Sequence, residues 1–171
     1  MIRLPSAPKS LLWAWAVVTG ALYCVLAYGS YVTMPSLAGG IAGFDMQPFG
    51  MSGEQGIAYL AAMTEEGRDY YLNWLKPVDT AFIAALSALL LLLAIRIKGW
   101  SGGITGLSAL AYASFDLVEN LLVSSLITHG TKSDTADFVE TIAMFTTAKF
   151  LSLGVVGVAL IIGWRRSNAQ R

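Results

Sequence analysis

The sequence predicts an all-α integral membrane protein, a single membrane domain over residues 1–171 built as a four-helix bundle with two short interfacial helices in its first outer loop. Three observations predict this class. Hydrophobic residues make up 56% of the chain and charged residues 13%, whereas soluble domains carry about 25% charged residues. The mean hydropathy is +0.62. Four apolar runs are each long enough for the roughly 20 helical residues that cross a bilayer.

The first apolar run, residues 11–33, is compatible with a membrane helix or with a signal peptide. Arg3 and Lys9 precede it and small residues follow it, as in a signal peptide. The run is, however, longer than the apolar segment of about 7 to 15 residues that a signal peptide has. We therefore expect a retained membrane anchor.

The first outer loop, residues 34–77, is too short to bury an independent core. Ser52 and Gln55 have the spacing of a capping box, and Thr64 is a suitable N-cap residue, so two short helices at the membrane surface are expected. The preceding stretch "MPSLAGGIAGFDMQPFG" is rich in Gly and Pro and predicts an irregular segment over the outer helix ends. Such a loop either closes over a site as a lid or simply connects two spans, and a simple connection is the more common case.

Three further spans are expected at residues 78–97, 103–127 and 138–163. Pro77 suits the first position of a helix, which would place Asp79 in the first turn, where the helix dipole favours a carboxylate. The positive-inside rule then sets the orientation. The basic residues expected on the cytoplasmic side are Arg3, Lys9, Arg96, Lys98, Arg165, Arg166 and Arg171. The prediction is a multi-pass protein of the cell inner membrane, with both termini cytoplasmic.

The segment "FDLVENLL" places Asp116, Glu119 and Asn120 inside the third span. With a rise of 1.5 Å per residue, Asp116 lies ~20 Å from the inner end of its span and Lys149 lies ~21 Å from that of the fourth span. A charge at mid-bilayer costs roughly 2.5 to 3.5 kcal/mol, so these side chains should face the bundle interior and pair. One polar stripe is expected along Thr105, Ser108, Tyr112, Asp116, Glu119, Asn120 and Ser124.

We call this stripe of the third span, together with Lys149 of the fourth span that faces it, the polar seam. Its charges do not balance. Asp116 and Glu119 face one Lys149, and Asp79 lies within ~3 Å of Glu119 in depth. Glu119 is therefore the candidate for proton uptake or for binding a cationic group. In the alternative, the seam is a structural lock in which a protonated Glu119 hydrogen-bonds Asn120 or a facing hydroxyl. The candidate ligand-binding or proton-binding residues are Asp116, Glu119, Asn120, Lys149, Asp79, Tyr28 and Tyr112.

Three classes of function are compatible with such a seam. The favoured class is a ligand-binding protein or accessory subunit of a membrane complex, which would hold a lipid-like or cationic ligand or a partner helix. The second is a small proton-coupled transporter that acts as a dimer. The third is a lipid-modifying enzyme with Asp116 or Glu119 as general acid or base. It is least favoured, because no nucleophile, metal-ligand or phosphate-loop motif occurs and no catalytic residue can be assigned.

Composition also limits the partners and cofactors. The net charge is zero, which does not favour nucleic acid. A lone Cys24 and a lone His129 provide no metal-binding cluster of cysteine or histidine. The expected partners are membrane lipids, with a partner membrane protein or a second copy of the chain as further possibilities, and nothing in the sequence indicates a particular cofactor.

Three motifs resemble an uncharacterised family of bacterial four-span integral membrane proteins. These are "FDMQPFG" in the first outer loop, "GRDYYLNWLKPVD" before the second span and "FDLVEN" in the third. Together they extend the resemblance over most of the chain. The resemblance implies a four-span topology. It implies no activity, because none is assigned to that family.

Overall fold

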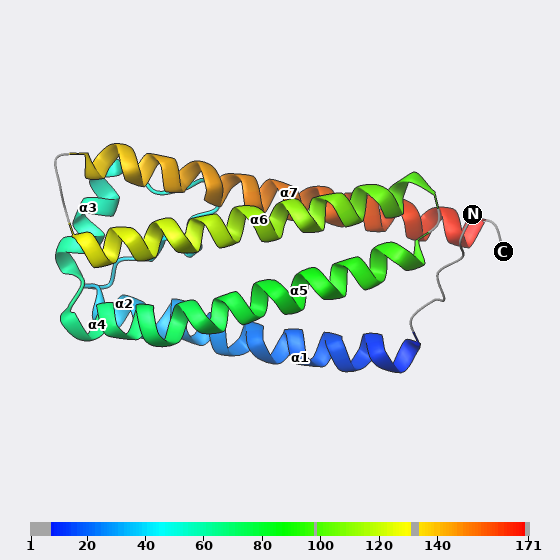
Figure 1. The fold of residues 1–171 in the computed structure, drawn as a ribbon, viewed down its shortest axis with the longest axis horizontal. Helices are drawn as coiled ribbons and strands as arrows, with labels where there is room; N and C mark the ends of the chain where they lie inside the picture. Colours follow the sequence, from blue (N-terminus) through cyan, green and yellow to red (C-terminus); the bar gives the residue numbers. More distant parts are fainter. Residues whose placement is uncertain (1–7, 98, 131–133, 170–171) are drawn as a thin grey trace.

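The computed structural model describes residues 8–97, 99–130 and 134–169. These ranges contain helices and loops and no strand, which confirms the all-α prediction. The long helices are α1 (Lys9–Tyr28), α5 (Lys76–Arg96), α6 (Trp100–His129) and α7 (Thr135–Ala169). Figure 1 shows them side by side in the order α1, α5, α6, α7, with the start of α1 and the end of α7 at the same end of the bundle.

Packing between the long helices follows this order. α6 packs against α5 and α7, and α1 packs against α5. Among the described residues, α1 and α7 do not pack along one another. Thr19 is the single buried residue of α1. The first span is therefore a peripheral helix, and the interior is formed mainly by α5, α6 and α7.

Within the described ranges, four helical segments are long and apolar enough to cross a membrane, as predicted. All four extend beyond the predicted spans, and the second does so most, because its helix begins at Glu65 instead of residue 78. The four segments are Lys9–Leu37, Glu65–Arg96, Trp100–His129 and Thr135–Ser167.

Two π-helical turns explain why the first and second spans are longer than expected. The turn η1 (Gly29–Thr33) joins α1 to α2 (Met34–Leu37), and η3 (Tyr71–Leu75) joins α4 (Glu65–Tyr70) to α5.

Each π turn is followed by a proline at the same spacing, Pro35 after η1 and Pro77 after η3. A proline has no N–H to donate, and its ring clashes with the carbonyl four residues earlier in a regular α-helix. In the wider turn, the backbone N–H of Met34 bonds the carbonyl of Gly29, five residues earlier, and Lys76 bonds Tyr71 in the same way. The helix therefore continues through the proline. Pro77 and Asp79 thus lie in the first turn of α5, as expected, but this turn continues the helix from α4, so Asp79 has no free helix end to cap.

The first outer loop contains the 3-10 turn η2 (Phe44–Met46) and the helix α3 (Gly53–Ala62). The predicted capping box is formed at the start of α3, where Ser52 and Gln55 exchange hydrogen bonds. Thr64 caps α4 by accepting from the backbone N–H of Gly67 at 3.0 Å. The second short helix is thus present, but it runs on into the second span instead of standing alone.

Small residues hold α3 tightly against α7. A Cβ added to Gly53 would lie 2.9 Å from the Cα of Ala136, and one added to Gly56 would lie 2.5 Å from a methyl group of Val139. Neither contact leaves room for a side chain. The glycine spacing therefore allows the loop backbone to lie directly on α7 and fixes the position of the turn η2 that precedes α3.

Candidate functional site

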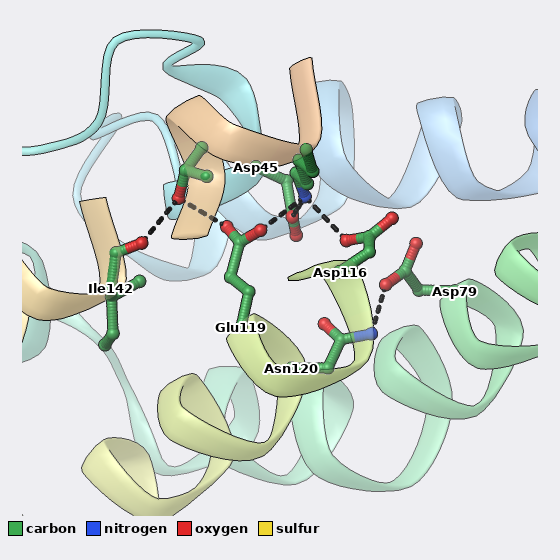
Figure 2. Close-up of polar contacts among 8 residues, drawn as sticks. Asp45, Asp79, Asp116, Glu119, Asn120 and Ile142 are labelled. Carbon is green, nitrogen blue, oxygen red and sulfur yellow. Dashed lines mark hydrogen bonds and ion pairs between the residues drawn. The ribbon is translucent and has the colours of Figure 1, made fainter. Parts of the chain in front are cut away.

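The ammonium group of Lys149 lies at the centre of the buried polar cluster. Its Nζ donates hydrogen bonds to Asp45 Oδ1 at 2.7 Å and to Asp116 Oδ1 at 2.8 Å. It also forms an ion pair with Glu119 Oε2 at 2.7 Å. The predicted pair of Asp116 and Lys149 is present. Figure 2 shows carboxylates from the outer loop and from α6 meeting around this one ammonium group.

Glu119 is fully buried, with 0% of its surface exposed. Its Oε1 accepts a hydrogen bond from the hydroxyl of Thr146 at 2.7 Å, while Oε2 faces Lys149. Glu119 thus has the facing hydroxyl expected for a structural lock, but it is paired with Lys149 instead of Asn120. Both of its oxygens contact α7, and they join α6 to that helix.

A second polar pair connects α6 to α5. The Asn120 amide donates to Asp79 Oδ2, and both side chains are buried. Tyr112, one helical turn before Asp116, places its hydroxyl against the Asp116 carboxylate. The seam expected between the third and fourth spans is therefore present and extends across α5 as well (Figure 2).

Asp45 is the cluster residue that sequence reasoning missed. The sequence predicts only that the loop around it is an irregular segment over the outer helix ends. In the structure, the turn η2 inserts Asp45 between the helices and leaves its side chain 27% exposed. The sequence does contain a feature that could have identified Asp45. Asp45 is the only charged residue between Lys9 and Glu54, and a single acid in an apolar, Gly-rich stretch indicates a buried partner.

Aromatic packing holds the turn that carries Asp45. Phe44 is buried and meets the ring of Tyr59 edge to face, with centroids 5.6 Å apart. Burial, together with the negative charge of Asp45, raises the pKa of the Tyr59 phenol well above its usual range. The phenol therefore stays neutral. Since Tyr59 lies on α3, the contact of α3 with α7 also positions Asp45 toward Lys149.

Tyr28 is not part of the cluster. Its side chain is 65% exposed, although the sequence placed it at the depth of Glu119. The reason is that α1 packs on α5 alone, so that most of its surface faces outward. Tyr31, three residues further on, instead borders the cavity beside the cluster.

A cavity of about 330 Å³ lies next to the carboxylates, between α1, α5, α6 and α7. It reaches the surface at Tyr23 and Tyr31, which are both largely exposed. The walls combine acidic and aromatic groups with one lysine. They include Asp45, Asp79, Asp116, Lys149, Tyr23, Tyr31, Phe82, Tyr112 and Phe150.

The position between the acids is already taken by a cation. The carboxylate oxygens of Asp45, Asp116 and Glu119 lie within 4.8 Å of one another, which is close enough to hold a metal ion. Lys149 Nζ, however, lies 2.7 to 2.8 Å from all three. A metal ion would have to displace this ammonium group. A further cation has room in the cavity, where Asp79 and Asp116 also form part of the wall.

Comparison with known proteins assigns neither a family nor a function to the chain. No family model, curated protein or solved structure matches the chain. The resemblance to bacterial four-span proteins therefore stays a prediction, and the chemistry of the cluster and its cavity carries the functional argument.

Proposed function

We propose that the protein binds a small organic cation within the membrane, in the cavity beside Asp45, Asp79 and Asp116. One observation carries this proposal, which is the excess of acid in the polar cluster that borders the cavity. Asp45, Asp79, Asp116 and Glu119 contribute four carboxylates, and Lys149 contributes one ammonium group. Buried carboxylates are costly in a membrane unless cations or protons offset them. A bound cation would supply that offset.

The aromatic walls favour an organic cation over a metal ion. A substituted ammonium group is attracted to the faces of aromatic rings by roughly 0.5 to 2 kcal/mol per contact. Phe82, Tyr112 and Phe150 border the same cavity as the carboxylates. An apolar, positively charged ligand would satisfy both kinds of wall, whereas a hydrated metal ion would satisfy the acids alone.

We place the protein in the cell inner membrane with both chain termini in the cytoplasm. This orientation rests on the predicted basic cytoplasmic side. Every Asp and Glu lies between residues 45 and 79 or between residues 116 and 140. These segments lie toward the outer-loop end in Figure 1, so the cavity would belong to the outer half of the bundle.

Packing on the inner side of the cavity favours binding over transport. Leu86 and Leu153 form part of the cavity wall and also pack against the buried cluster of Leu90, Ala109 and Val156. These apolar side chains close the cavity on that side. A proton-coupled transporter would have to open this cluster in each cycle, and it would need a second copy to complete the path.

Thermal unfolding in the presence of two isosteric probes tests the proposal. Benzyltrimethylammonium carries the positive charge, and neopentylbenzene has the same shape without the charge. We expect the ammonium compound to raise Tm and the hydrocarbon to leave it unchanged, since a ligand at 100 times its Kd stabilises by about 2.7 kcal/mol. Equal shifts with the two probes would contradict a site for cations.

A pair of variants locates the effect. Asp79→Asn removes a cavity carboxylate and keeps an oxygen to accept from Asn120, so we expect the fold to persist and the Tm shift to disappear. Asp69→Asn is the matched control, because Asp69 accepts from Asn73 at 2.7 Å on the exposed surface, away from the cavity. It should retain the full shift. Equal shifts in both variants would place cation binding elsewhere.

A further inference from the structure

A long apolar groove runs along the outer surface of α6 and α7 and meets the acidic cavity only at Phe150, which lines both. Its volume is about 690 Å³, and its walls include Trp100, Ile104, Leu151, Val155 and Ile162. From Thr147 near one end to Ile162 near the other, the helical rise gives a length of ~22 Å. The groove is thus long and apolar, which suits an extended hydrocarbon chain.

A glycine keeps the floor of this groove open. Gly154 lines the groove, and a Cβ added there would meet no atom within 4 Å. Phe49 from the outer loop is 92% exposed and stands at the opposite end from Trp100. The loop therefore lengthens the groove beyond the two helices that form its floor.

The other end of the groove carries positive charge. The guanidinium group of Arg166 lies over the ring of Trp100, 4.9 Å from its centroid, and Trp100 is part of the groove wall. Arg165 is its neighbour in the chain. Residues 1–44, 80–115 and 141–171 contain no Asp or Glu. The segments that form this end of the bundle therefore offer no Asp or Glu side chain to compete for the arginines.

We propose that this groove binds an anionic phospholipid, with one acyl chain along α7 and the phosphate group paired with Arg166. Arginine binds phosphate through charge-assisted and often bidentate hydrogen bonds. Basic residues at the membrane surface attract anionic lipids. A second copy of the chain fits less well. Copies in one membrane share an orientation, so a symmetric contact here would bring the arginines of both copies close together at the same depth.

Native mass spectrometry after reconstitution tests this site. The protein is placed in nanodiscs with equal amounts of palmitoyl-oleoyl phosphatidylglycerol and palmitoyl-oleoyl phosphatidylcholine, and the lipids retained on its release are counted. We expect the wild-type protein to retain phosphatidylglycerol preferentially. Arg166→Gln should lower this preference roughly fivefold, as expected for the loss of one basic residue near the surface.

Two glycine variants test whether lipid retention depends on the groove or on the rest of the helix surface. Gly154→Leu would fill the groove and should reduce the retention of both lipids. Gly157→Leu is the matched control on the same helix. A Cβ there also meets nothing within 4 Å, but Gly157 is not part of the groove wall. It should behave as the wild-type protein. Leucine favours a helix more than glycine does, so neither change should disrupt α7.

Three results would overturn the proposal. The first is equal retention of the two lipids by the wild-type protein. The second is equal lipid retention by Gly154→Leu and Gly157→Leu. The third is a wild-type dimer that Gly154→Leu alone converts to a monomer without loss of lipid, because the groove would then be an interface between two copies.

Discussion

The two halves of the bundle differ in what holds the helices together. At the outer-loop end, two spans contain π turns, and α6 is joined to α5 and α7 by buried ionic and amide side chains. At the opposite end, Leu90, Ala109 and Val156 pack as an apolar cluster. All eleven acidic residues belong to the segments of the outer half. Among the described residues, the buried charged side chains Asp79, Asp116, Glu119 and Lys149 all lie in the outer half. This concentration at one depth favours a binding site over a continuous transmembrane path.

The outer half depends on charge, so the largest effect is expected at Lys149. Lys149→Met would leave Asp45, Asp116 and Glu119 facing one another without a cation. Breaking a buried ionic pair by removing one partner typically costs about 3 to 5 kcal/mol. We expect a large fall in Tm in detergent. Lys76→Met, which removes a lysine of the second span outside the cluster, is the control, and equal losses in both variants would show that the cluster does not stabilise the fold.

Packing of the outer loop should have the next largest effect. Gly53→Ala adds a Cβ only 2.9 Å from the Cα of Ala136 and must push α3 away from α7. Overpacking of this kind costs typically 1 to 3 kcal/mol. Thermal unfolding measures the loss. Gly20→Ala, on the open face of α1, has nothing within 4 Å of its new Cβ and should not destabilise the protein.

The ionic contact of the outer loop can be tested separately from its packing. Asp45→Asn keeps an oxygen near Lys149 but removes the charge, so we expect a loss of about 1 kcal/mol. Hydrogen exchange should show lower protection of the loop around residues 44–62 with little change in α6. If protection of this loop is unchanged, Asp45 does not hold the loop against the bundle.

The smallest effect is expected at Glu119. Glu119→Gln removes one of three carboxylates around a single ammonium group and keeps an oxygen for the Thr146 hydroxyl. The remaining acids, Asp45 and Asp116, still pair with Lys149. We expect Tm to stay equal or to rise, with any loss below about 1 kcal/mol. A loss as large as that of Lys149→Met would instead make Glu119 the main partner of the lysine.

Much of this contrast could be predicted from the sequence, because local properties determine it. The lengths of the apolar runs predicted the four spans. Helical rise placed Asp116 and Lys149 at one depth, and the helical period placed Glu119 and Asn120 on the same stripe. The Asp116 and Lys149 pair follows from depth and charge alone, since a buried acid and a buried lysine at one level stabilise each other.

The remainder depends on contacts between distant parts of the chain. Asp45 reaches Lys149 because Gly53 and Gly56 let α3 lie on α7, and this approach has no local pattern that fixes its register. Tyr28 faces outward because α1 lacks a second neighbour. Pro77 was taken to begin a helix, whereas a preceding π turn accommodates it inside one. For Asp45 and Tyr28 the deciding contacts join segments far apart in the chain, whereas for Pro77 the deciding feature is the local π turn, which the apolar pattern does not reveal.

Photoaffinity labelling tests the central claim most directly, namely that the acidic, aromatic cavity is a site for an organic cation. The reconstituted protein is labelled with an azido derivative of benzyltrimethylammonium, with and without excess unlabelled ligand, and the modified peptides are sequenced. Our account predicts competed labelling at Phe82 or Tyr112, which line the cavity but not the groove, and loss of that labelling in Asp79→Asn. Labelling that is not competed, or that falls on exposed residues such as Trp13 and Trp164, would contradict it.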